Sequence, residues 1–278
     1  EAGLMQKGFT GHSAALPDNV AETITQRPGV KNVTKMYRNT FEDSQVSCDW
    51  GINYEADEEA TESLGFPDNI KEGQNKSGKS MAESHAALTP DGRPLGNVYG
   101  VSENLIDKLD IREGEKNKSV LKEKLQNENG IILVSRYNDF GEFNEFSETG
   151  YVNRQVGDQI QFYENGVPTE TYTVVAKAVT VEMETGTLCG PGGNIQESIG
   201  GPIMYMSENH FKELYENPPL YCILFDTERE YQQEVETYLS EYTTQENMDI
   251  LYQSTEKLGA TVQTIKNATL LIGGLIGG

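Results

Sequence analysis

The sequence has few of the residues that most often carry chemistry. Its 278 residues include three cysteines, three histidines and one tryptophan. The cysteines, Cys48, Cys189 and Cys222, are too few for a disulfide framework and form no C-x-x-C motif. A disulfide between Cys48 and Cys222 and two separate buried thiols both fit the sequence, and we expect the thiols.

Common catalytic and metal-binding patterns are missing too. His12, His85 and His210 stand far apart without the spacing of metal ligands, and we interpret His210 as a helix-surface residue. No serine lies in a G-x-S-x-G motif, so Ser207 is interpreted as a helix cap rather than a nucleophile. A calcium loop of the D-x-[DN]-x-[DN]-G type does not occur. We therefore predict no catalytic centre, no metal site and no cofactor.

Positive charge is scarce. The sequence has 22 Lys and Arg against 44 Asp and Glu, which gives a net charge of −22. A field of this sign repels nucleic acid and anionic lipid headgroups, which argues against both as partners. An acidic surface would favour a cationic peptide as client. A solvated acidic surface without such a client also fits, and we favour it.

Long apolar runs are absent until the end of the chain. Ser254 can cap a helix with Leu258, Val262 and Ile265 on one face, followed by the uncharged run 268–278 (ATLLIGGLIGG). Eleven helical residues span about 16 Å, whereas a membrane helix needs about 20 residues. The run fits the start of a truncated membrane helix, or a buried or Gly-rich end. Its two Gly-Gly pairs favour the membrane helix.

Strand and helix patterns alternate in the last third of the chain. The pattern predicts a strand at 202–206, a helix capped by Ser207, and a buried strand at 220–225. Thr227 and Glu230 form a T-x-x-E capping box, which predicts the start of another helix.

The start of the chain is also mixed. We interpret residues 1–15 as the outgoing end of a helix, followed by a helix at 18–26 and a strand at 30–38. Residues 46–54 alternate apolar and polar side chains, which predicts a half-buried strand whose inward face holds Trp50.

The middle of the chain is richer in strand patterns. Residues 55–98 are acidic and then rich in Gly, Asn, Ser and Lys, which predicts an extended surface segment. Beyond it we expect a helix capped by Ser102, a helix from Ser119, a buried strand at 131–135 and a β-hairpin around Asn165.

We therefore predict an α+β fold with two lobes, because consecutive elements tend to be neighbours in space. The predicted divisions are an N-terminal linker (1–16), an α+β lobe formed by both ends of the chain (17–54 and 202–252), an inserted β-rich lobe (55–201, which opens with the surface segment 55–98), and a final helix that runs into the truncated membrane helix (253–278).

A nucleotide-binding motif occurs in an unsuitable setting. The matching residues of G-x-x-x-x-G-K-[ST] are Gly73, Gly78, Lys79 and Ser80. In a working P-loop, Lys79 would reach the outer phosphates, and Ser80 and Asp226 would hold Mg²⁺. A P-loop follows a buried strand, but the preceding residues GFPDNIKE carry a proline and three charges. We interpret the match as spurious and the segment as a flexible loop.

Several segments together carry a resemblance to a known family. They are LPDNVAETITQRPGVKNVT, NVYGVSENLIDKLDIREG, the V-G-D strand from Val156, PIMYMSENHFKEL, and LYCILFDTEREYQQEVETYL with the later ATLLIGG. The sequence resembles the extracytoplasmic domain of FtsX/MacB-type ABC transporter permeases over nearly its whole length. The motifs are patterns of hydrophobicity and turns, with no invariant catalytic signature. Residues 55–98 depart from the simpler family pattern as an extra loop.

The resemblance implies a fold and a function. The expected fold is a porter-like βαβ lobe built from both ends of the chain, with an inserted β-rich lobe, between the first two membrane helices of a permease. The expected role is non-enzymatic mechanotransmission: a cytoplasmic ATPase partner hydrolyses ATP, and a stalk near 1–9 and 254–266 passes the movement outward. The resemblance thus implies that the segments 1–16 and 253–278 form a stalk. Two permease copies would pair through the membrane, and the domain would lie on the extracytoplasmic side of the cell membrane.

Other features stay open at the level of sequence. The client would be a lipid, peptide, drug or cell-wall hydrolase partner, and nothing in the residues selects among them. An extracellular ligand-binding or receptor module is the alternative function, and a P-loop nucleotide-binding protein is a weaker third. Since the chain starts without Met or a signal peptide and stops abruptly, we expect it to be a fragment of a larger protein.

Overall fold

The computed structural model describes residues 2–6, 16, 18–39, 45–51, 97–136, 154–180, 203–216, 218, 220–242 and 250–254. The strands are β1 (Ala2–Gln6), β2 (Val30–Arg38), β3 (Val46–Cys48), β4 (Asn97–Val101), β5 (Asp110–Gly114), β6 (Gly130–Arg136), β7 (Gln159–Glu164), β8 (Val167–Thr180), β9 (Ile203–Ser207), β10 (Leu220–Thr227) and β11 (Ile250–Ser254). The helices are α1 (Asp18–Thr25), α5 (Glu103–Lys108), α6 (Lys118–Asn127), α7 (Glu208–Leu214) and α8 (Gln232–Glu241).

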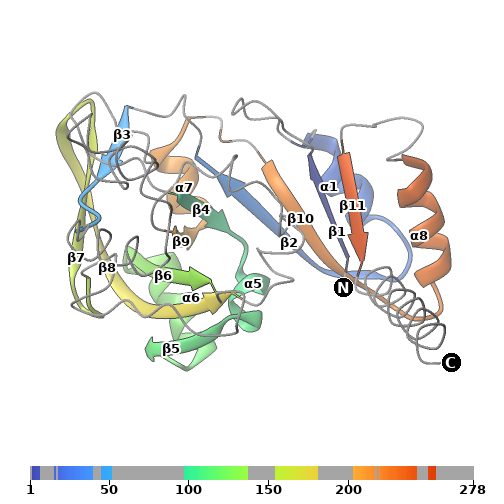
Figure 1. The fold of residues 1–278 in the computed structure, drawn as a ribbon, viewed down its shortest axis with the longest axis horizontal. Coiled ribbons are helices and arrows are strands. Elements are labelled where there is room, and N and C mark those ends of the chain that lie inside the picture. The colour runs from blue at the N-terminus through green and yellow to red at the C-terminus, as the bar shows by residue number, and fades with distance from the viewer. Residues whose placement is uncertain are drawn as a thin grey trace, which may run out of the picture.

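The described strands form one mixed sheet that falls into two groups (Figure 1). Its order is β11-β1-β10-β2-β4-β9-β6-β8-β7-β3, and β5 pairs with β8. We call β11, β1, β10 and β2 the end strands, because they come from the first and last parts of the chain. We call β4, β9, β6, β8, β7, β3 and β5 the middle strands. Strand β2 pairs with β4 where the two groups meet.

The first and last described strands are neighbours. Strand β1 lies between β10 and β11 and is antiparallel to both. Ala2 pairs with Ser254, and Gln6 pairs with Ile250. The chain therefore enters and leaves the described fold through adjacent strands.

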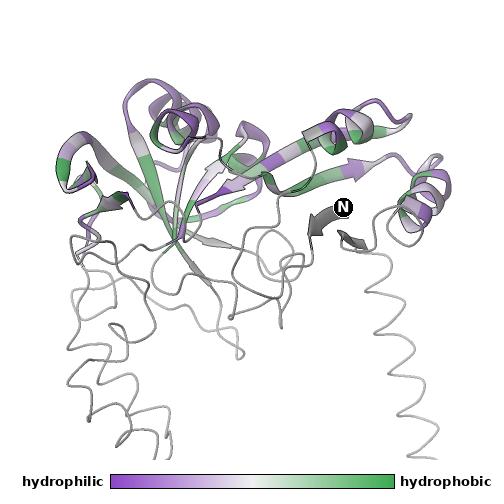
Figure 2. Cartoon of the chain, turned by 90° about the horizontal axis from the view of Figure 1, so that it is seen from above, coloured by the Kyte–Doolittle hydropathy of each residue, from purple (hydrophilic) through white to green (hydrophobic). Residues whose placement is uncertain are grey.

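Helices cover both faces of the sheet and create two cores. Successive residues of a strand point to opposite faces, so Tyr37 belongs to one core and its neighbour Met36 to the other. Helices α1, α7 and α8 pack on the Tyr37 side, and α5 and α6 pack on the Met36 side. Figure 2 shows the apolar residues concentrated on the strands and the polar ones on the outer surfaces of the helices.

Several predicted features are confirmed. The fold is α+β, with the expected helix at α1 and strand at β2. Asn165 and Gly166 both have positive φ angles at the turn between β7 and β8, as a tight hairpin requires. Ser207 caps α7, because its side chain accepts a hydrogen bond from the His210 N–H. Cys48 and Cys222 are buried thiols on opposite faces of the sheet.

Three helix or strand starts differ from prediction. The capping box at Thr227 is wrong: the ladder between β10 and β2 extends to Thr227, and α8 begins only at Gln232. Helix α6 is capped by Asn117, whose side chain accepts from the Ser119 and Val120 N–H groups, so Ser119 is inside the helix. Residues 2–6 form strand β1 rather than the end of a helix, because they complete the sheet between β10 and β11.

Strand β3 is shorter and more buried than its alternation suggests. It covers Val46–Cys48, all three of which are buried, and it pairs with β7. Trp50 is nevertheless buried in the core as expected, with 1% of its surface exposed. Since β3 and β9 hydrogen-bond to middle strands, both segments lie in that part of the sheet. The division of the chain into lobes stays a prediction.

Gly100 on β4 allows α7 to approach the sheet closely. A Cβ atom at Gly100 would lie 2.5 Å from Phe211 Cβ and 2.6 Å from Phe211 Cγ. Phe211 is fully buried, with 0% exposure, so its ring has no room to turn aside. An alanine at this position would therefore displace α7.

We expect Gly100→Ala to lower the free energy of unfolding by about 2 to 3 kcal/mol through overpacking. Gly157→Ala is the matched control, because Gly157 has φ +97° but no atom within 4 Å of an added Cβ. Backbone strain alone should cost about 1 kcal/mol there. Urea unfolding of both variants checks this, and equal losses would show that the contact with Phe211 is unimportant.

Candidate functional site

The two groups of strands are joined by a short ladder. Strand β2 pairs with β4 through Met36 with Val101, Tyr37 with Gly100, and Arg38 with Tyr99. We call these three pairs the seam. In the sheet order of the described residues, they are the link between end strands and middle strands.

Further hydrogen bonds extend the seam at both ends. At one end, the Asn39 N–H donates to the Val98 carbonyl (3.1 Å), and the Val98 N–H donates to Asn39 Oδ1 (2.9 Å). At the other end, the Ser102 N–H donates to the Lys35 carbonyl (3.1 Å). Asn39 is fully buried and has no access to water. The bond from the Val98 N–H therefore satisfies its side-chain oxygen inside the core.

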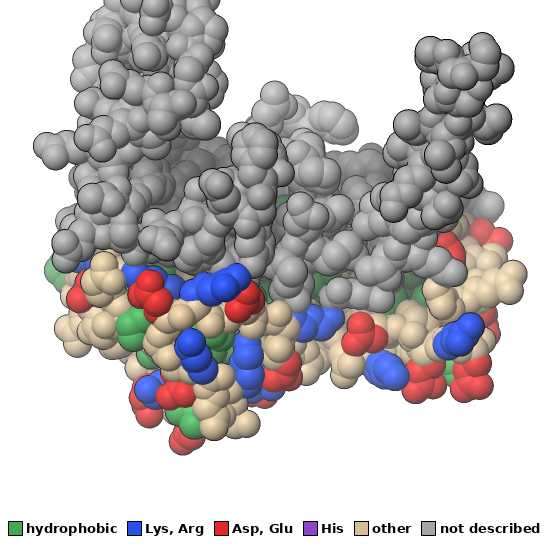
Figure 3. Space-filling model, turned by 60° about the horizontal axis from the view of Figure 1, so that its bottom comes forward, with side chains coloured by type: hydrophobic (Ala, Val, Ile, Leu, Met, Phe, Trp, Pro, Cys, Tyr) green, Lys and Arg blue, Asp and Glu red, His purple; other side chains and the backbone are tan. Residues whose placement is uncertain are grey.

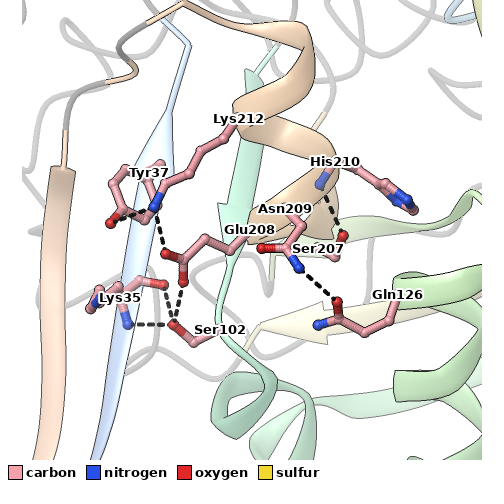
Figure 4. A network of polar contacts seen from close by, with 9 residues as sticks. All are labelled: Lys35, Tyr37, Ser102, Gln126, Ser207, Glu208, Asn209, His210 and Lys212. Carbon is pink, nitrogen blue, oxygen red and sulfur yellow. Dashed lines mark hydrogen bonds and ion pairs between the residues drawn. The ribbon is translucent and has the colours of Figure 1, made fainter.

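A network of five polar residues bridges the seam on the side of α7 (Figure 4). We call it the seam network; its members are Lys35 and Tyr37 of β2, Ser102 before α5, and Glu208 and Lys212 of α7. Lys212 Nζ donates to Glu208 Oε1 (2.7 Å) and to the Tyr37 hydroxyl (3.2 Å). The same ammonium lies 4.3 Å from the centre of the Tyr37 ring, a cation–π distance.

Ser102 connects β2 to Glu208. Its Oγ accepts from the Lys35 N–H (3.0 Å) and lies 3.2 Å from both the Lys35 carbonyl oxygen and Glu208 Oε2. A serine hydroxyl has one hydrogen, so it donates to one of these oxygens at a time. Ser102 occupies the position before α5, but its side chain does not cap that helix. Ser102 is therefore at the N-cap position as predicted, but its hydroxyl bonds to β2 and Glu208 instead of to the helix.

The charges of the network hold one another in the ionised state. Burial alone would raise the pKa of Glu208, but the hydrogen bond and charge of Lys212, the charge of Lys35 and the Ser102 hydroxyl outweigh it and lower that pKa. Burial alone would lower the pKa of Lys212, but its hydrogen bonds to Glu208 and Tyr37 raise it. Both groups therefore stay charged across the neutral range.

A repeated motif places these residues. Strands β4 and β9 are parallel neighbours, and each runs directly into Ser-Glu-Asn and a short helix. The two helices lie on opposite faces of the sheet, so the two motifs are used differently. The Ser207 side chain accepts an N–H of its own helix, whereas the Ser102 side chain accepts none from α5 and instead contacts Glu208 of the other motif. The repeat is visible in the sequence and is the signal by which this site could have been found.

A cavity of about 800 Å³ adjoins the seam network and shares Lys35 and Tyr37 with it. Its lining comes from α1 and the residue after it, from alternate residues of β2 and from the start of β10: Ala21, Glu22, Thr25, Gln26, Val33, Lys35, Tyr37 and Leu220. Sequence analysis did not anticipate this cavity, because it depends on how α1 sits on β2.

The residues singled out from the sequence are dispersed. His210 is half-buried on α7, with its ring packed edge-on against Tyr172 at 5.7 Å, rather than on the helix surface. Asp226 accepts a hydrogen bond from Asn32 Nδ2 (2.8 Å) and lies 3.8 Å from Lys108 Nζ. The P-loop match at 73–80, and His12, His85 and Cys189, lie outside the described residues.

Charges of both signs share the face shown in Figure 3. Ion pairs on α5, β5 and α6 include Asp107 with Lys122 (2.8 Å) and Asp110 with Arg112 (2.7 Å).

Comparison with known proteins gives similarity in structure only. No protein-family model matches the chain, and no curated protein matches its sequence. Two solved structures that are similar to it follow. The periplasmic region of MacB from Actinobacillus actinomycetemcomitans is 11% identical with a TM-score of 0.45, over 94% of this chain and 92% of that one. The extracellular domain of the noncanonic ABC-type transporter YknZ from Gram-positive bacteria is 11% identical with a TM-score of 0.42, over 91% and 100%.

Within the described ranges, no helix is both long enough and apolar enough to span a membrane.

We expect Glu208→Gln to lower the free energy of unfolding by about 1 kcal/mol at pH 7, since the residue is partly exposed and solvent screens its ion pair. The pKa of Glu208 is lowered on folding, so its contribution is present above its usual pKa of 4.5 and is lost as pH falls through the lower folded value. The gap between wild type and variant should therefore close in acid, as measured by urea unfolding from pH 7 to pH 3.

Glu103→Gln is the matched control for this prediction. Glu103 occupies the same place in the other Ser-Glu-Asn motif but is exposed, with one long hydrogen bond of 3.4 Å from Gln126. Its replacement should change stability by less than about 0.5 kcal/mol at any pH. A pH-independent gap for Glu208→Gln would show that the ion pair does not stabilise the seam.

Proposed function

We propose that the chain is the extracytoplasmic domain of an ABC transporter permease subunit, and that it passes movement from the membrane to its middle strands. The observation that carries the proposal is the pairing of β1 with β11, which brings the entry and exit of the chain together. A domain inserted between two membrane helices needs this arrangement. The resemblance of the sequence to FtsX/MacB-type permeases supports it.

The sheet provides a continuous route for such movement. A displacement of β1 and β11 acts on β10 through the ladder of β1, and on β2 through the six register pairs between β10 and β2. From β2 it reaches β4 and β9 through the seam. The end strands and the middle strands would move as two bodies, and the seam is the ladder between them, where their relative angle would change.

The remaining roles follow from this proposal. The end strands form the lobe next to the membrane, the middle strands form the outer lobe, and the seam is their boundary. A cytoplasmic ATPase partner and a second permease copy supply the movement, and the domain itself is non-catalytic. It acts on the extracytoplasmic side of the cell membrane in the export or extrusion of a peptide, drug or lipid.

A ligand-binding module is the second candidate. The cavity of about 800 Å³ between α1 and β2 favours it, since ligand pockets have this size. The two functions are compatible, because the cavity and the seam network share Lys35 and Tyr37.

The proposal is tested by distances in the full-length permease with its ATPase. Spin labels replace Glu123 on α6 and Thr237 on α8, both exposed, and their separation is measured with and without ATP. We expect the distance distribution to shift, because the labels sit on opposite sides of the seam. A second pair, Asn19 on α1 with Thr237, lies within the end-strand part and should stay unchanged.

Two outcomes would contradict the proposal. One is an unchanged Glu123–Thr237 distance while the ATPase hydrolyses ATP. The other is found by sequencing the coding DNA on both sides of the chain. The proposal requires flanking membrane helices of about 20 apolar residues. Their absence would remove the coupling to a membrane.

A further inference from the structure

The cavity between α1 and β2 has a floor with a definite chemical character. Val33, Lys35 and Tyr37 alternate along β2, so they face the same side of the sheet. Leu220 adds an apolar side chain at the start of β10. Val33 is half-buried, and Tyr37 and Leu220 are 9% and 4% exposed, so the floor is largely apolar.

The ammonium group of Lys35 is the positive charge of the floor, and the described carboxylates around it do not form an ion pair with it. Glu208 Oε1 already accepts from Lys212, and Glu208 Oε2 lies within bonding distance of Ser102. The charge of Lys35 acts on Glu208, but among the described residues no carboxylate lies within ion-pair distance of the Lys35 ammonium. Lys35 is therefore available to an anionic group that enters the cavity.

A hydrogen-bond donor lies beside this charge. The Tyr37 hydroxyl oxygen accepts from Lys212 Nζ, which leaves its own hydrogen to donate. The opposing wall is the exposed side of α1. There the Thr25 hydroxyl donates to the Ala21 carbonyl, and the Gln26 amide can donate or accept. The negative charge of the lining, Glu22, is exposed on that wall.

We propose that this cavity binds a small ligand with a carboxylate and an aliphatic body. The carboxylate pairs with Lys35 and accepts from the Tyr37 hydroxyl, and the aliphatic part packs on Val33 and Leu220. Such a ligand is either an aliphatic acid or the C-terminal end of an apolar peptide. This goes beyond the transmission of movement, and it is opposite in sign to the cationic client that the net charge of −22 suggests.

Occupation of the cavity also bears on the seam. A carboxylate at Lys35 pairs with a charge that otherwise acts on Glu208, and the hydrogen of the Tyr37 hydroxyl gives it a second partner beside Lys212. The ligand therefore changes the surroundings of the residues that bridge β2 and α7.

The test is titration of the isotope-labelled 278-residue chain, followed by amide NMR. The probes are octanoate, trileucine, trileucine amide and trilysine, each up to about 5 mM, a range suited to weak ligands. We expect octanoate or trileucine to shift the amides of Lys35, Tyr37 and Gln26, with trileucine amide about tenfold weaker because it lacks the carboxylate. Which of the two acids binds tighter separates the aliphatic acid from the peptide end.

Three variants of the chain sharpen this test. Lys35→Met should weaken binding of the acid about tenfold, whereas Glu22→Gln should strengthen it, because a repulsive charge is removed. Lys31→Met is the matched control: it lies on the same strand and pairs with Glu228 at 3.7 Å, outside the cavity. It should leave binding unchanged.

The proposal is overturned by any of three results. These are equal binding of trileucine and its amide, tighter binding of trilysine than of the acids, or no shift of the cavity amides with any probe. The outcome is independent of the coupling to ATP hydrolysis, so its failure would leave the distance measurement in the permease complex untouched.

Discussion

The structure depends on a seam of three residue pairs between β2 and β4. Every other ladder of the described sheet lies within one of the two groups of strands. A ladder this short has few hydrogen bonds of its own, so the side chains around it decide how firmly the groups are joined. Glu208 is central among them, because it connects α7 with Ser102, and through Ser102 with the backbone of β2. It also pairs with Lys212 on the next turn of α7, which reaches the Tyr37 hydroxyl of β2.

The position of this carboxylate explains why the seam can be firm and still adjustable. Its partners are polar and partly exposed, so the network contributes about 1 kcal/mol rather than the larger amount typical of core packing. The apolar packing nearby is more rigid: Gly100 lets Phe211 press directly onto β4. Tight packing of α7 on β4 and a polar network between α7 and β2 are compatible with a joint between two stiff parts.

Local patterns predicted local structure well, and long-range pairing poorly. The Asn165 turn and the Ser207 cap depend on neighbouring residues, so the sequence was sufficient for them. Thr227 does not cap a helix because it pairs with Val30 in the ladder between β10 and β2. Val30 is far away in the sequence, so local patterns could not predict this pairing. The seam network was out of reach for the same reason: Ser102 and Glu208 are 106 residues apart, and only the repeated Ser-Glu-Asn hints at their relation.

The most direct test of this account is hydrogen exchange at the seam in wild type and in Glu208→Ala. The amides of Asn39, Val98 and Ser102, which bond across the seam, should exchange faster in the variant. Amides of the ladder between β6 and β8 should be unchanged, because that ladder lies within the middle strands. Exchange that rises equally in both places, or in neither, would contradict the claim that Glu208 holds the two groups of strands together.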